Sequence, residues 1–156
     1  EVRTLFELIE EYYINFKNVA NEENLKISHL GSNRNLSKKL IKIINDVVNI
    51  TKRNNGTSIN LAFNYGGRSE IVDSINKNKL TKITSKNISK NLYIPDLPEP
   101  DLIIRTGGEM RLSNFLMWQS AYTELYFTKI LWPNFKIKSL NKILSIYFNR
   151  IRKYGQ

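Results

Sequence analysis

The stretch that decides the fold is Asp101-Leu-Ile-Ile-Arg-Thr-Gly-Gly-Glu-Met-Arg-Leu-Ser113. Its apolar beginning is typical of a buried strand, and this strand delivers Arg105 into a tight turn at Gly107-Gly108. Arg111 and Ser113 follow within eight residues, so three anion-binding groups can converge on one ligand. A Gly-Gly turn lets backbone N–H groups approach a ligand closely, and a guanidinium binds phosphate through two parallel hydrogen bonds. The stretch therefore predicts a strand that ends in a diphosphate-binding loop.

A second strand ends in a similar way further upstream. Residues 58–65 alternate large apolar and smaller side chains, and Asn64 and Arg68 flank the pair Gly66-Gly67. Ligands bind at the carboxyl ends of the strands in an open parallel sheet, so we expect both glycine pairs at one edge. A basic turn at a helix N-terminus there suits phosphate oxygens. For this first pair taken alone, an ordinary tight connection between strand and helix explains the glycines at least as well.

Apolar periodicity elsewhere predicts alternating helices and strands. The expected helices are 2–16, 35–53, one beginning near Ser69, 84–92, 114–120 and 139–152, and the expected strands are 25–30, 58–65, 101–105 and 123–128. Strands separated by helices imply βαβ units and a parallel sheet. The predicted fold class is therefore α/β, a single domain with a parallel β-sheet flanked by helices.

The composition is that of a basic globular domain. The 24 Lys+Arg against 14 Asp+Glu give a net charge of +10, which attracts phosphorylated small molecules, nucleic acid or anionic lipid. A genomic bias toward lysine codons explains much of this excess equally well. The absence of cysteine excludes disulfides and thiolate metal sites, and neither a P-loop nor a Rossmann fingerprint is present. No apolar run reaches the length of a membrane span. Because the chain starts at Glu1 inside a helical pattern, we expect a fragment of a longer domain.

Two glutamates and a histidine need separate interpretation. Glu124 lies among aromatic residues in a strand-like segment, where a carboxylate requires a cation. A basic neighbour and a mostly hydrated Mg²⁺ beside the diphosphate both satisfy that requirement, and the choice stays open. Glu109 either orients an arginine of the loop or lies in solvent. His29, the single histidine of the chain, is interpreted as a structural residue.

Three segments together resemble the cis-prenyltransferases, of the bacterial undecaprenyl diphosphate synthase (isoprenyl transferase) type. They are Asn64-Tyr-Gly-Gly-Arg68, the block from Asp101 to Gln119, and Ala121-Tyr-Thr-Glu-Leu-Tyr-Phe127 followed by Leu131-Trp-Pro133. Their order and spacing hold along the whole chain, and the block 101–127 is highly specific.

The resemblance implies condensation of isopentenyl diphosphate with an allylic diphosphate, usually farnesyl diphosphate. Repeated cis additions would build a long-chain polyprenyl diphosphate such as undecaprenyl diphosphate, a precursor of the cell-wall lipid carrier. The residues implied in isopentenyl diphosphate binding are Arg105, Arg111, Leu112 and Ser113. Glu124 is implied as a ligand of the cofactor Mg²⁺, and Asn64, Arg68 and Glu109 are further candidates for the site.

The chain departs from the family pattern at its amino terminus. The Asp-Gly-Asn-x-Arg-Trp motif, which binds the allylic diphosphate and supplies a Mg²⁺-ligating aspartate, is absent. A later asparagine linked to proton removal is absent too. The resemblance therefore puts the catalytic residues upstream of Glu1 and makes residues 1–156 the carboxy-terminal portion of one domain. Lys153 and Met110 stand where the family often has arginine and histidine.

The resemblance also implies partners and a location. It implies a cytoplasmic homodimer, with the basic tail 149–155 near the partner's site, and it allows peripheral contact with the inner face of the membrane through the lipid product. Nucleic acid is not an expected partner, because the arginines gather in one loop and not along a helix face. The alternative is an inactive fragment or accessory subunit that keeps dimerisation and one diphosphate site.

Overall fold

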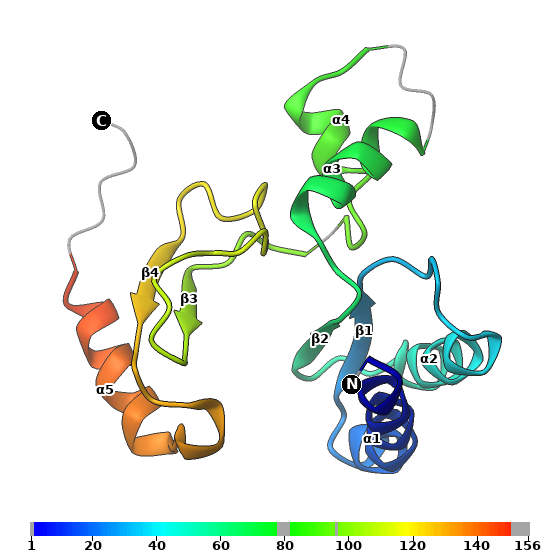
Figure 1. Cartoon of the computed structure of the whole chain (residues 1–156), viewed down its shortest axis with the longest axis horizontal. Helices are drawn as coiled ribbons and strands as arrows, with labels where there is room; N and C mark the ends of the chain where they lie inside the picture. The colour runs from blue at the N-terminus through cyan, green and yellow to red at the C-terminus, as the bar shows by residue number, and fades with distance from the viewer. Residues whose placement is uncertain (1, 78–81, 96, 151–156) are drawn as a thin grey trace.

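The structure is a computed structural model that describes residues 2–77, with side chains from Glu7 onward, 82–95 and 97–150. Its helices are α1 (Val2–Glu22), α2 (Lys38–Thr51), α3 (Gly67–Asn76), α4 (Ser85–Ser89) and α5 (Ile137–Phe148), with a 3-10 turn η1 (Trp132–Asn134). Its strands are β1 (Lys26–Leu30), β2 (Ser58–Ala62), β3 (Leu102–Arg105) and β4 (Glu124–Phe127). Figure 1 shows helices packed around parallel strands, and the predicted α/β class is confirmed.

The amino-terminal part packs α1 and α2 against the parallel pair β1–β2. Its buried core comes from both helices and from β1, and consists of Tyr13, Ala20, Ile27, Leu40, Ile44 and Val47. The Ser37 hydroxyl caps the first turn of α2 by accepting a hydrogen bond from the Leu40 amide at 3.0 Å. At the other end of α2, the buried Thr51 hydroxyl accepts one from the Ile27 amide at 3.1 Å. The hydrogen bond from Ile27 to Thr51 thus fixes the position of α2 along β1.

The carboxy-terminal part contains the second parallel pair, β3–β4, and α5. Leu102 pairs with Glu124, and Arg105 pairs with Phe127. In Figure 1, α5 lies beside β4, and its residues Ile143 and Tyr147 are buried. The register places Arg105 at the carboxyl end of the pair, where the loop 106–123 begins.

The four strands form two separate pairs and not one continuous sheet. Periodicity reports that a strand is half-buried, but it carries no information about which strand lies beside it. In Figure 1 the two pairs lie apart, and the chain around α3 and α4 connects them. The expected parallel pairing is therefore present, while its continuity across all four strands is not.

The expected helix at 114–120 is wrong. This segment is a series of turns, because Ser113, Asn114 and Leu116 have φ values of 48°, 67° and 47°. Such left-handed residues interrupt the repeating backbone hydrogen bonds of an α-helix. The other helices are confirmed with shifted ends, and the last one ends at Phe148, while residues 151 and 152 lie outside the described residues.

Candidate functional site

The structure brings Arg105 and Ser113 into direct contact. The Arg105 Nη1 donates a hydrogen bond to the Ser113 Oγ at 2.8 Å and another to the Arg111 carbonyl oxygen. Arg105 is half-buried at the end of β3, whereas Ser113 and Arg111 are exposed. The loop therefore folds back onto the end of β3. Arg111 and Ser113, which are predicted to bind the same ligand as Arg105, hold the Arg105 side chain in place. The role of these residues in binding stays a prediction.

The turn at Gly107 and Gly108 has a different use from the expected one. Their φ values of 89° and 82° explain why glycine occupies both positions. Their N–H groups, however, donate to the Ile130 and Thr128 carbonyl oxygens, each at 2.9 Å. These amides are engaged with the segment after β4, so the expectation that they face a ligand is wrong. The glycines shape the loop, and the predicted anion contacts fall to the side chains that follow.

Glu109 forms an ion pair with Arg111. Of the two alternatives for Glu109, the structure therefore shows the one in which it orients an arginine. Both side chains are largely exposed, so the pair contributes little to stability. Leu112 is half-buried between Arg111 and Ser113. Of the predicted residues, Arg111, Leu112 and Ser113 thus lie in one loop, and Arg105 ends the strand that leads into it.

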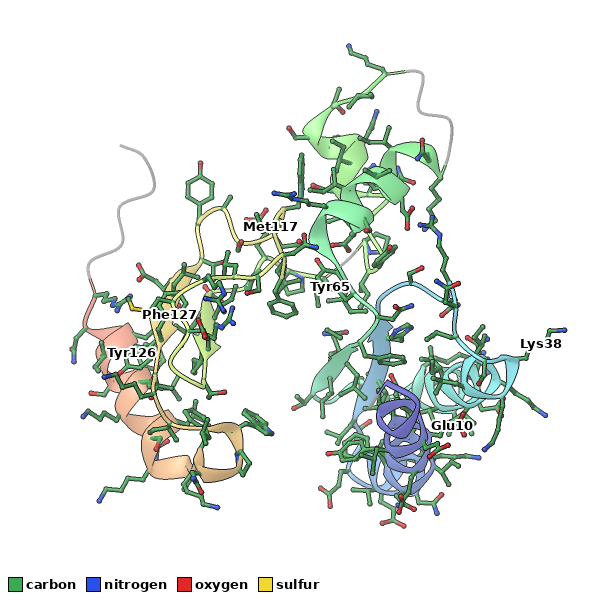
Figure 2. All side chains as sticks on the ribbon, in the orientation of Figure 1. Glu10, Lys38, Tyr65, Met117, Tyr126 and Phe127 are labelled. Carbon is green, nitrogen blue, oxygen red and sulfur yellow. The ribbon has the colours of Figure 1, made fainter. Side chains whose placement is uncertain are left out.

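The turn after β2 packs against this same loop. The Gly67 amide donates to the Asn114 carbonyl oxygen at 2.8 Å, and the Arg68 amide donates to the Asn114 Oδ1 at 2.9 Å. A Cβ on Gly67 would approach the Met117 Cγ to 2.9 Å, so the close packing requires glycine. Figure 2 shows Tyr65 and Met117 at this junction between the two parts of the chain. The upstream glycine pair thus contacts Asn114, just after the predicted loop, but the two glycine pairs follow strands of separate sheets, so the expectation of one shared sheet edge is wrong.

Asn64 has a structural role in the described residues. Its Nδ2 donates to the Ser32 and Arg34 carbonyl oxygens at 2.6 and 2.8 Å. These bonds tie the end of β2 to the loop between β1 and α2. The Asn64 backbone has a φ of 49°, a conformation that asparagine tolerates well. The side chain thus fixes the start of the turn, and a contact with a ligand remains a proposal.

A buried carboxylate, Glu70, holds the site together and was not predicted from the sequence. Its side chain is 1% exposed and accepts hydrogen bonds from the Tyr65 hydroxyl at 2.6 Å, the Tyr93 amide at 3.0 Å and the Gln119 Nε2 at 3.0 Å. Burial raises the pKa of Tyr65, and the hydrogen bond to Glu70 raises it further. A sequence signal existed, because an acidic residue in the first turn of a helix is favoured. Two of its partners, Tyr93 and Gln119, lie 23 and 49 residues away, and their pairing with Glu70 gave no signal in the sequence.

A second polar cluster lies beside this one. Asp73 accepts hydrogen bonds from the Tyr93 hydroxyl, at 2.7 Å, and from Arg34. Burial disfavours the charged form of Asp73, but the bonds from Tyr93 and Arg34 outweigh that effect and lower its pKa. Burial and the bond to Asp73 raise the pKa of Tyr93 to about 12. The cluster joins α3 to the loop after β1.

Glu124 is not beside the Arg105–Ser113 contact within this chain. It pairs with Leu102 at the start of the strands, three residues before the pairing of Arg105, so the two positions differ by roughly 10 Å along the strand. Its carboxylate accepts a hydrogen bond from the Arg150 Nη1. The alternative of a basic neighbour is therefore realised, and a metal ligand at this position requires further groups.

Among the described residues, no three His, Cys, Asp or Glu side chains gather in a way that could hold a metal ion. Mg²⁺ does bind through one or two carboxylates when waters and substrate phosphates complete its octahedron. Glu124 fits that chemistry as a single carboxylate whose charge Arg150 now balances.

Two cavities border this region. A polar one of about 440 Å³ lies at the carboxyl ends of β1 and β2, and its lining includes Arg34, Asn64, Ser69 and Asn114. An apolar one of about 460 Å³ is lined by Leu8, Ile9, Tyr12, Tyr13, Leu61, Ala62 and Phe63. The buried Tyr13 hydroxyl has no hydrogen-bond partner among the described residues. Within the described ranges, no helix is both long and apolar enough to cross a membrane.

Sequence comparison places these features among known proteins. The family model "Putative undecaprenyl diphosphate synthase" matches residues 1–155. An isoprenyl transferase of Fusobacterium nucleatum is 44% identical over 158 residues, which cover 99% of this chain and 68% of that protein. The chain spans between 56% and 70% of the length of the curated relatives that it matches.

Solved structures agree with that family. The crystal structure of a probable undecaprenyl diphosphate synthase from Campylobacter jejuni matches with a TM-score of 0.91 and 31% identity, covering 100% of this chain and 75% of that one. Lavandulyl diphosphate synthase from Lavandula x intermedia, in complex with dimethylallyl diphosphate, matches with a TM-score of 0.90 and 31% identity, covering 100% and 72%.

Proposed function

Because this chain belongs to the undecaprenyl diphosphate synthase family, we propose that the protein carrying it is a prenyltransferase that elongates an allylic diphosphate with isopentenyl diphosphate in cis. The observation that carries the proposal is the contact between Arg105 and Ser113, which the folded-back loop holds at the end of β3. A guanidinium so placed is already oriented for a phosphate group, which lowers the entropy lost on binding.

The loop is the binding site for isopentenyl diphosphate. Arg105 and Arg111 donate to its phosphate oxygens, and the Ser113 hydroxyl donates a further hydrogen bond. Glu109 keeps the Arg111 side chain over the loop until the substrate arrives. Leu112 offers an apolar contact beside these groups. Such a site positions the attacking double bond, and positioning is a large share of catalysis when two substrates must meet.

The apolar cavity between α1 and β2 is the place for the hydrocarbon chain. Its lining is dominated by aliphatic and aromatic side chains, as burial of an isoprenoid requires. The solved lavandulyl diphosphate synthase holds dimethylallyl diphosphate, an allylic diphosphate, which supports this substrate class. Farnesyl diphosphate is the proposed allylic substrate. The proposed product is a long-chain polyprenyl diphosphate such as undecaprenyl diphosphate, a precursor of the cell-wall lipid carrier.

Mg²⁺ is the proposed cofactor, with Glu124 as one ligand. When bound, it supplies positive charge that stabilises the leaving diphosphate. Glu124 must then exchange its hydrogen bond from Arg150 for the metal. Catalytic groups for ionisation and proton removal are proposed to lie in the part of the relatives that this chain does not span.

A homodimer is proposed as the working assembly. An exposed apolar surface follows β4 and supports it: Leu131 is 59%, Trp132 74% and Ile137 71% exposed. Large exposed apolar patches mark interaction sites. The proposed location is the cytoplasm, with peripheral contact between the lipid product and the inner face of the membrane. An inactive or accessory subunit has less support, because Arg105, Arg111 and Ser113 are all retained and gathered.

The test is incorporation of labelled isopentenyl diphosphate by the full-length protein that carries this chain. With farnesyl diphosphate and Mg²⁺ present, we expect labelled polyprenyl diphosphates that extend with time. Binding of isopentenyl diphosphate without any incorporation would support the accessory subunit instead. Absence of both would refute the prenyltransferase.

A further inference from the structure

The first turn of α3 is capped by a residue from a distant part of the chain. The N-cap residue is Gly66, which has no side chain with which to accept a hydrogen bond from the helix. Asn114 supplies both acceptors instead. Its carbonyl oxygen accepts from the Gly67 amide at 2.8 Å, and its Oδ1 accepts from the Arg68 amide at 2.9 Å. One residue thus satisfies two amides that the helix itself leaves without partners.

Asn114 directly follows Ser113, whose Oγ accepts the hydrogen bond from Arg105. Both residues are left-handed, with φ values of 67° and 48°. Asparagine tolerates the left-handed conformation better than most residues, whereas serine has a lower intrinsic preference for it. The bonds to α3 therefore impose a backbone direction that turns Ser113 back toward β3. The Asn114 cap of α3 offsets the cost of the left-handed Ser113 backbone, since an N-cap contributes about 0.5 to 2 kcal/mol to stability.

We propose that Asn114 is a positioning residue for the diphosphate site: by capping α3 it holds Ser113, and through it Arg105, in the arrangement that binds isopentenyl diphosphate. This role rests on the function proposed above. Asn114 need not touch the substrate, and it acts through its neighbour.

The far end of the same loop is held by other contacts. The Gln119 Nε2 donates to Glu70 at 3.0 Å, and the Trp118 Nε1 donates to the Ser89 Oγ at 3.0 Å. Loss of the Asn114 cap should therefore loosen the ligand end of the loop while the remainder stays docked. A general loss of folding is not the expected result, which separates positioning from a merely structural role.

The chain offers a closely matched control in Asn24. Its backbone is also left-handed, with a φ of 53°. Its carbonyl oxygen accepts from the Gly56 amide at 3.1 Å, and its Oδ1 accepts from the Asn55 amide at 3.2 Å. It precedes β1, at the opposite ends of the strands from Asn114. Asn24→Ala keeps the carbonyl oxygen and, like Asn114→Ala, removes a side-chain oxygen that accepts from a backbone amide, together with the Asn24 Nδ2 bond to the Asn55 Oδ1, at a site remote from the loop.

The experiment compares Asn114→Ala, Asn114→Asp and Asn24→Ala in the full-length protein. For Asn114→Ala we expect the KM for isopentenyl diphosphate to rise about tenfold, which corresponds to loss of a typical cap, while the KM for farnesyl diphosphate stays near that of the wild type. Asn114→Asp keeps an acceptor at the same place and a charge that suits a helix N-terminus, so it should restore most of the affinity. Asn24→Ala should leave both KM values unchanged.

Amide hydrogen exchange supplies a readout that does not depend on turnover. Exchange at the Arg68 amide, which loses its side-chain acceptor, should accelerate in Asn114→Ala and not in Asn24→Ala. An unchanged KM for isopentenyl diphosphate in Asn114→Ala, with the wild type active, overturns the positioning role alone. Equal rises in both KM values would also overturn it, because they indicate general disorder. A wild type that neither binds nor incorporates isopentenyl diphosphate refutes the proposed function, and the positioning role with it.

Discussion

Arg150 donates a hydrogen bond to the Glu124 carboxylate and so joins the segment that follows α5 to the start of β4. The two side chains are 37% and 26% exposed, so the pair is partly shielded from water. Glu124 is also the proposed Mg²⁺ ligand. The protein's own cation therefore lies where the carboxylate would meet the metal, and the two compete for one group.

Arg150→Gln should make Mg²⁺ bind more easily. Removal of the competing guanidinium is expected to lower the Mg²⁺ concentration for half-maximal activity about twofold to fivefold, the range of a partly exposed ion pair. Glu124→Gln should raise it well above that of the wild type. Magnesium titrations of activity and calorimetric binding in the presence of isopentenyl diphosphate measure both effects. Lys39→Gln, which breaks the surface pair with Glu10, is the control and should change neither.

Arg105→Ala should weaken isopentenyl diphosphate binding strongly. A lost charge-assisted hydrogen bond costs about 1.5 to 3 kcal/mol, so we expect kcat/KM for that substrate to fall about tenfold to a hundredfold. Arg105→Lys should recover little, because an ammonium cannot contact Ser113 and grip a phosphate through two parallel bonds. Steady-state kinetics measure the change, with Arg53→Ala, just beyond α2, as control. Near-normal kinetics in Arg105→Ala would remove this residue from the site.

Glu70→Ala should destabilise the fold more than a surface substitution. It would leave the Tyr65 hydroxyl, the Tyr93 amide and the Gln119 Nε2 without their acceptor, and buried polar groups left unpaired cost about 1 to 3 kcal/mol each. We expect the free energy of unfolding in urea to drop by about 2 to 3 kcal/mol. Glu70→Gln keeps an acceptor and should lose less. Glu23→Ala, at an exposed position after α1, should be nearly neutral, and an equally small loss in Glu70→Ala would contradict the interpretation.

Stability should fall with pH below neutrality through His29. Burial lowers the pKa of this ring from 6.5, while the hydrogen bond with the Phe63 carbonyl opposes the shift. The unfolded chain then binds a proton more readily than the folded one. The contribution of His29 to the free energy of unfolding is therefore fully present above pH 6.5, and it declines as the pH falls below that value. Urea midpoints between pH 7.5 and pH 5 measure the decline, and His29→Gln should flatten it. A slope that persists in that variant would assign the effect to other groups.

Local patterns predicted most elements and the central loop. The helical spacing in α2 identifies its buried face, although the helix starts at Lys38 and not at the expected residue 35. The order of Arg105, Gly107, Gly108, Arg111 and Ser113 predicts a strand, a turn and a cluster of anion-binding groups. The strand and the turn are present, the Arg105 side chain contacts Ser113 and the Arg111 carbonyl oxygen, and anion binding stays a prediction. Such features depend on residues close in sequence, so a local reading suffices for them.

The same reading failed at the segment 114–120. Its apolar and aromatic residues suggest a helix, yet Asn114 and Leu116 are left-handed because the segment docks onto α3 and α4. Tertiary contacts outweigh local propensity there. The use of the Gly107 and Gly108 amides was misjudged for the same reason, since their acceptors lie beyond β4.

By itself, the sequence determined an α/β chain that resembles a prenyltransferase family, with one arginine at the end of its third strand and a second in the loop that follows. The fold class and the loop follow from side-chain type and short spacing, whereas the family follows from the resemblance of whole segments and from the matching family model. Only the tertiary structure decided the partners: Asn114 with Arg68 across 46 residues, Gln119 with Glu70 across 49, and Arg150 with Glu124 across 26. It also divided the strands into two pairs. Hydrogen bonds and ion pairs form between groups that are close in space. The spacing of residues along the chain does not predict which distant groups come into contact when the chain folds.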